Sequence, residues 1–114
     1  MQVYLQSSPH FQFDARATPL VAESADTVYL VHVLEHLDEP TGWSVVLEAL
    51  RLARHRLVIA VPFEEVVVTQ YGHVRAFDIP ALKRLAGRIE QVTTPGRART
   101  RVDAYHGGWL VVDL

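Results

Sequence analysis

Two stretches of the chain are almost continuously apolar, and an amphipathic stretch separates them. Residues 27–34 (TVYLVHVL) and 56–62 (RLVIAVP) are rich in β-branched side chains, which is typical of strands buried on both faces of a parallel sheet. Residues 41–55 predict a helix, with Thr41 as its N-cap. Strand, helix and strand within about 35 residues predict a βαβ unit with a right-handed crossover. The apolar positions at helical spacing are Trp43, Val46, Leu47, Leu50 and Ala53.

The rest of the pattern predicts one more helix and several shorter strands. A helix is expected over residues 79–88, with Asp78 as its N-cap, Pro80 in its first turn and Gly87 near its end. The fold class is therefore α/β: a mostly parallel sheet finished by a C-terminal antiparallel hairpin, with the helices packed on it. We expect residues 1–114 to form one domain. The shorter predicted strands cover residues 11–15, 90–94, 100–105 and 109–114.

Composition excludes several classes of protein but does not indicate a particular function. The 114 residues are 49% hydrophobic, which is enough for a core, and the net charge of −2 gives no reason to expect nucleic acid or an anionic membrane as a partner. The chain has no cysteine, so disulfides and thiolate chemistry are excluded. The N-terminus lacks the pattern of a signal peptide, and no apolar run approaches the roughly 20 residues of a membrane span, so we expect a cytoplasmic location.

Residues 32–36 spell H-V-L-E-H, which matches the H-x-x-E-H signature of one class of zinc peptidases. Two histidines four residues apart can meet at one metal on a helix, but on a strand they lie about 13 Å apart. Zinc–nitrogen bonds are about 2 Å long. Because the segment before His32 has strand composition, we expect His32 and His36 to point to separate places. We therefore interpret the match as chance and predict no metal ligands.

In this βαβ context the same letters resemble another family, the class I S-adenosylmethionine-dependent methyltransferases. Many members have an aspartate-led fourth strand followed by V-L-E-H and a D-x-P turn, as in residues 26–40 here. The likeness keeps its order and spacing over roughly residues 11–88. It implies a Rossmann-like methyltransferase domain, here running from its third strand to its C-terminus. The other matching segments are residues 14–20, 47–51 (LEALR), 61–62 (VP) and 72–77 (GHVRAF).

The chain departs from the family at its most diagnostic feature, a glycine-rich turn that approaches the cofactor. That turn would precede residue 11, and none of the six glycines forms a G-x-G pair. The resemblance therefore covers a C-terminal half of the domain, and half of the cofactor site is absent from it.

The resemblance implies S-adenosylmethionine as the cofactor and a small molecule as the methyl acceptor. Asp14, with Ala15 beside it, would contact the adenine amino group, and His32 would lie under the cofactor at the end of a strand. Each residue also has a structural interpretation. Asp14 suits a turn after a strand, and His32 could be satisfied by backbone groups in a buried strand.

The same resemblance implies that Glu35 and His36 line the mouth of the active site. In some members that take catechol-like or hydroxylated substrates, this pair helps to place a divalent metal or the acceptor oxygen. Transfer to oxygen needs a base, and His36 or His73 could serve near neutral pH. The alternative is a helix-start glutamate, an exposed histidine and a structural role for His73 in the long connection over residues 63–77. Glu64 is expected to be solvated.

The sequence leaves two other interpretations open. The chain could be a degenerate, non-catalytic domain of this fold, or a fragment of a longer reading frame. Loss of the first strands would expose a sheet edge beside residues 11–15, and such an edge favours pairing with another chain. We therefore expect the chain to form a homodimer or to pair with a complementing partner chain.

Overall fold

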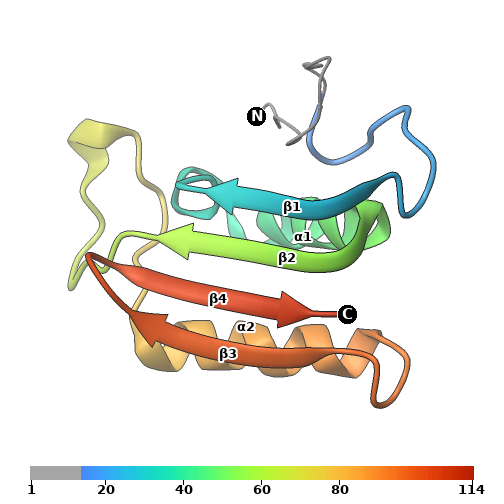
Figure 1. The fold of residues 1–114 in the computed structure, drawn as a ribbon. Coiled ribbons are helices and arrows are strands. Elements are labelled where there is room, and N and C mark those ends of the chain that lie inside the picture. Colours follow the sequence, from blue (N-terminus) through green and yellow to red (C-terminus); the bar gives the residue numbers. More distant parts are fainter. Residues whose placement is uncertain (1–13) are drawn as a thin grey trace.

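A computed structural model describes residues 14–114 as an α/β layer built on one four-stranded sheet (Figure 1). The strands lie in the order β1-β2-β4-β3. Two α-helices and two short 3₁₀ turns connect them. The elements are β1 (Ala25–Val31), η1 (Leu34–His36), α1 (Glu39–Leu52), β2 (Ala53–Val61), η2 (Thr69–Tyr71), α2 (Ile79–Val92), β3 (Arg99–Ala104) and β4 (Gly108–Asp113).

The sheet is mixed. β1 and β2 are parallel and joined through α1, which gives the predicted βαβ unit. β4 runs antiparallel to both β2 and β3, so the C-terminal hairpin is also present. The prediction of a mostly parallel sheet is wrong for the described residues, because β4 inserts between β2 and β3 and makes two antiparallel pairs.

Both helices lie behind the same face of the sheet in Figure 1, α1 behind β1 and β2, and α2 behind β4 and β3. The core fills the space between this face and the helices. Its fully buried side chains alternate along the strands, as a face that packs on helices requires. They include Val28 and Leu30 of β1, Leu57 and Ile59 of β2, Leu110 and Val112 of β4, Val45, Val46 and Ala49 of α1, and Leu82 and Ile89 of α2.

Aspartates cap both helices. The Asp38 carboxylate accepts the backbone N–H of Thr41 at 2.9 Å, so Asp38 is the N-cap of α1 and the prediction of Thr41 in that role is wrong. This hydrogen bond lowers the pKa of Asp38 below its usual value. Asp78 caps α2 as predicted, accepting the N–H of Ala81 at 2.8 Å.

The ends of the elements differ from prediction in two places. α1 ends at Leu52 rather than at residue 55, because Ala53 already pairs with Ala25 as the first residue of β2. α2 continues to Val92, so the strand predicted over residues 90–94 is wrong. Buried Ile89 continues the apolar face of α2 past Gly87, and this tertiary packing outweighs the weak helix propensity of glycine.

The strand predicted over residues 11–15 lies mostly outside the described residues. Asp14 forms a single β-bridge and Ala15 lies in a turn. In the part of the chain that is described, no helix has both the length and the apolar character needed to cross a bilayer.

Candidate functional site

The chain turns sharply where β1 ends. His32 donates its backbone N–H to the Ala60 carbonyl oxygen at 2.9 Å, which extends the ladder by one bond, but its φ of 55° takes the backbone out of the strand. The 3₁₀ turn η1 follows at once, and Glu35 within it is only 1% exposed. The strand predicted to reach Leu34 therefore stops at Val31. Polar side chains are thus gathered at the carboxyl end of a parallel strand.

The connection between β2 and α2 docks on this turn. The Glu35 carbonyl oxygen accepts backbone N–H groups from Val74 at 2.7 Å and from Arg75 at 3.2 Å. His36 Nδ1 lies 3.1 Å from the Gly72 carbonyl oxygen. These contacts place His73 beside His36, with ring centroids 4.9 Å apart and an interplanar angle of 78°. The docking joins two of the predicted catalytic residues across the fold.

Each of these two histidines is held through its Nδ1 atom. His36 Nδ1 faces the Gly72 carbonyl, which can only accept, so this nitrogen carries the proton. His73 Nδ1 lies 2.9 Å from both carboxylate oxygens of Glu64. The prediction that Glu64 is merely solvated is therefore wrong, and its side chain is only 12% exposed. In the neutral rings both Nε2 atoms are left with a free lone pair.

The Glu35 carboxylate lies between histidines. His32 Nδ1 and His36 Nε2 are each 3.8 Å from Glu35 Oε2. The strand ends before His32, and η1 brings His36 back toward the same carboxylate, so both rings lie beside Glu35. The ligand atoms close enough to share one ion come from Glu35, His36 and His73 and not from His32. Neither oxygen of Glu35 accepts a hydrogen bond from any residue between 14 and 114.

The three predicted catalytic residues thus form one cluster. One ligand atom from each of Glu35, His36 and His73 can be chosen so that all three lie within 4.8 Å of one another. The prediction of no metal ligands rested on an extended backbone over residues 27–34, whereas β1 ends at Val31 and η1 begins at Leu34. Glu64 and Gly72 support the cluster and were missed as site residues. The position of Glu64 just after a buried strand was the available signal.

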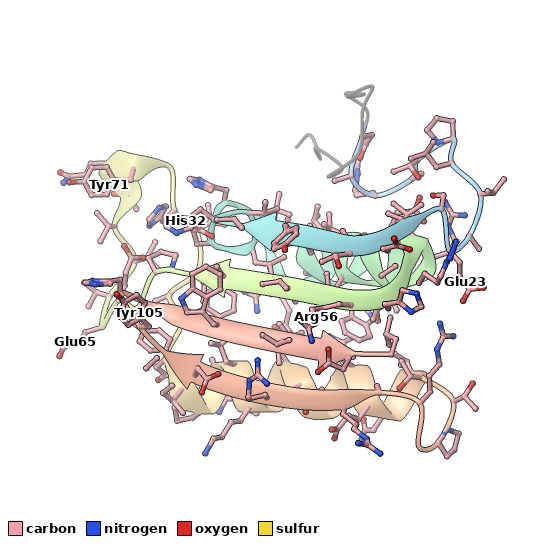
Figure 2. All side chains as sticks on the ribbon, in the orientation of Figure 1. Glu23, His32, Arg56, Glu65, Tyr71 and Tyr105 are labelled. Atoms are coloured by element: carbon pink, nitrogen blue, oxygen red, sulfur yellow. The ribbon has the colours of Figure 1, made fainter. Side chains whose placement is uncertain are left out.

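The residues predicted to contact the cofactor do not gather in the same way. Asp14 is exposed, and Arg16 donates to both of its carboxylate oxygens at 2.8–3.1 Å. The hydrogen bonds from Arg16 lower the pKa of Asp14. Ala15 is buried, whereas the His32 side chain is 59% exposed at the end of β1 (Figure 2). No hydrogen bond or ion pair within residues 14–114 joins Asp14 to His32.

A groove between the two helices lies away from this cluster. It is lined in part by arginines that already stack on aromatic rings: Arg88 lies 3.9 Å above the centre of the Trp43 ring. Arg75, also in the lining, lies 4.6 Å from the Phe77 ring centre, and burial lowers its pKa. The groove has no carboxylate–histidine cluster, so we place the candidate site at the strand ends.

Comparison with known proteins identifies a fold and no closer relationship. No family model and no curated protein matches the chain. Among solved structures, a SAM-dependent methyltransferase from Aquifex aeolicus aligns with a TM-score of 0.56 at 15% sequence identity. The alignment covers 91% of this chain and 52% of that one, so the chain spans about half the length of its structural neighbour. The mixed sheet with two helices on one face is compatible with part of a methyltransferase-like fold.

Proposed function

We propose that this chain is an S-adenosylmethionine-dependent methyltransferase-like domain acting on a small-molecule acceptor. The observation that carries the proposal is the position of the Glu35, His36 and His73 cluster at the carboxyl end of the parallel strand β1. Open α/β sheets bind their ligands at this end. The fold likeness to a methyltransferase and the sequence resemblance over residues 11–88 support the same function.

In this proposal His36 is the general base. Its Nδ1 proton is held by the Gly72 carbonyl, so Nε2 presents its lone pair and takes the proton of an acceptor hydroxyl. The Glu35 carboxylate, 3.8 Å from Nε2, stabilises the imidazolium that forms. S-adenosylmethionine would supply an electrophilic methyl group, and the rest of catalysis is the positioning of the acceptor. His73 is the second residue proposed to serve as the base.

The described residues fit only one side of such a cofactor. His32 is exposed at the end of β1 and can contact it, whereas the Asp14 oxygens already bind Arg16. We propose that a complementing partner chain supplies contacts to the other side of the cofactor. Calorimetry with S-adenosylhomocysteine tests whether the chain alone is sufficient. Saturable binding supports the enzyme, and no heat at millimolar ligand contradicts a self-sufficient enzyme.

A non-catalytic domain that pairs with itself or with another chain is the second candidate, and the exposed part of the helix-free face of the sheet, at β1, favours it. Tyr29 and Val31 on β1 are 37% and 47% exposed, and within residues 14–114 β1 pairs with β2 alone. Figure 2 looks onto this face, where Arg56 marks β2. An edge that has no partner strand within residues 14–114, beside exposed apolar side chains, favours association.

Light scattering during gel filtration tests this second candidate. We expect a dimer that Val31→Lys converts to a monomer, because the new charge would be buried at the contact. A monomer at all concentrations would contradict self-pairing.

A further inference from the structure

We propose that Glu35, His36 and His73 bind one divalent transition-metal ion. The proposal goes beyond methyl transfer and does not depend on it, since it rests on the local geometry of the cluster. The three side chains offer ligand atoms within 4.8 Å of one another. They come from two segments, η1 and the connection before α2, which the backbone hydrogen bonds from Val74 and Arg75 to Glu35 hold together.

The buried carboxylate of Glu35 is the first reason. A carboxylate removed from water is costly unless it is paired or coordinates a metal. Both oxygens of Glu35 are buried, and neither accepts a hydrogen bond from the described part of the chain. A bound cation would compensate this charge. Arg75 is not this cation: its guanidinium lies 4.6 Å from the centre of the Phe77 ring, and no ion pair within residues 14–114 joins it to Glu35.

The orientation of the two imidazoles is the second reason. Histidines that ligate metals usually donate their other ring N–H to a carboxylate or a backbone carbonyl, which fixes the tautomer and the ring plane. His36 Nδ1 faces the backbone carbonyl of Gly72, and His73 Nδ1 faces the carboxylate of Glu64. In each ring Nε2 is the nitrogen left to ligate. The hydrogen bonds that would orient both imidazoles toward a metal are therefore already formed.

The spacing of the ligand atoms is the third reason. Metal–nitrogen and metal–oxygen bonds of about 2.0–2.2 Å put neighbouring ligand atoms about 3.0–3.5 Å apart. His36 Nε2 and Glu35 Oε2 are now 3.8 Å apart. A contraction of less than about 1 Å closes this pair around an ion, which small side-chain rotations can provide. The ligand atom of His73 lies within 4.8 Å of the other two.

The ligand set also selects the metal. Two imidazole nitrogens and one carboxylate suit zinc, cobalt, iron or manganese, whereas magnesium and calcium prefer oxygen ligands. Three protein ligands leave a coordination position for water or for a substrate oxygen, as in catalytic sites. The metal and a proton compete for the same lone pair of His36 Nε2. In the metal-loaded protein His36 is therefore not the base, and metal dependence of activity separates the two roles.

Titration of the chelator-treated chain with Zn²⁺, Co²⁺ and Mg²⁺ tests the site. We expect one equivalent of Zn²⁺ or Co²⁺ by calorimetry, an absorption band of Co²⁺ with nitrogen ligands, and no binding of Mg²⁺ at millimolar concentration. Glu35→Gln and His36→Ala should each weaken Zn²⁺ binding by at least about 100-fold, and Glu64→Gln by about 10- to 100-fold. Circular dichroism checks that each variant remains folded.

His55→Ala is the matched control, because His55 lies 4.0 Å from the carboxylate of Asp26 on the surface and pairs a histidine with an acid in the same way. Its Zn²⁺ affinity should equal that of the unmodified chain. The proposal is overturned if Zn²⁺ and Co²⁺ give no stoichiometric binding at millimolar concentration, if His55→Ala weakens binding as much as His36→Ala, or if Mg²⁺ binds equally well. These results do not depend on S-adenosylmethionine, so they fail or succeed separately from the methyltransferase proposal.

Discussion

His36 and His73 meet edge to face, with ring centroids 4.9 Å apart, although they lie on separate connections of the fold. The contact exists because the segment that carries His73 donates two backbone hydrogen bonds to the carbonyl oxygen of Glu35. The candidate site therefore depends as much on backbone docking as on the side chains themselves. Changes at the docking contact should affect the site without removing any of its chemical groups.

Gly72→Ala tests this dependence. Gly72 has a φ of 75°, which L residues rarely adopt, and an added Cβ would lie 3.5 Å from the ring of His36. We expect a loss of about 1 kcal/mol in the free energy of unfolding and weaker binding of Zn²⁺ or substrate. Urea unfolding and calorimetry measure the two effects.

Gly87→Ala is the control for Gly72→Ala. It lies inside α2, and no atom lies within 4 Å of the added Cβ. Alanine there should stabilise the protein by about 0.5–1 kcal/mol through helix propensity and leave the site unchanged. Equal effects of the two substitutions would contradict the role of Gly72.

Glu35→Gln should stabilise the chain in the presence of a chelator. The substitution keeps the shape of the side chain and removes a buried charge that has no hydrogen bond within residues 14–114. We expect the free energy of unfolding at pH 7 to rise by about 1–3 kcal/mol, measured in urea. A loss of stability instead would mean that contacts with His32 or His36 already compensate the carboxylate.

Glu48 predicts the response of the fold to acid. Its carboxylate accepts two hydrogen bonds from Thr18, at 2.6 and 2.8 Å. It also forms an ion pair with Arg51 at 2.6 Å. The bond from Arg51 is the largest cause that lowers the pKa of Glu48 from 4.5 to about 2. Because the folded state binds the proton less readily, this stability is present above about pH 4.5 and is lost as the pH falls toward 2.

We expect Glu48→Gln to cost about 1–3 kcal/mol at neutral pH and to flatten the loss of stability between pH 4.5 and 2. Unfolding in urea across this pH range measures both. Glu39→Gln, on the same helix but 73% exposed and 3.8 Å from Arg88, should have a much smaller effect. If the acid profile of Glu48→Gln matched that of the unmodified chain, the assigned pKa would be wrong.

The βαβ unit could be predicted because the apolar runs of β1 and β2 and the helical spacing of α1 are strong local signals. The end of α2 could not be predicted from the sequence. Ile89 and Val92 suit a strand as well as a helix, and only tertiary packing decides between the two. The site residues Glu35, His36 and His73 were predicted from the family resemblance. Their meeting point was not, since the positive φ of His32 and the docking of Gly72 arise from tertiary contacts.

The most direct measurement is a nuclear magnetic resonance titration of the ¹⁵N-labelled chain with S-adenosylhomocysteine, because it reports binding and its location together. We expect saturable shifts of the amides at residues 32–36 and 72–75 and of the His36 ring nitrogens. No shifts at millimolar ligand, or shifts confined to the groove between α1 and α2, would contradict cofactor binding by this chain at its strand ends.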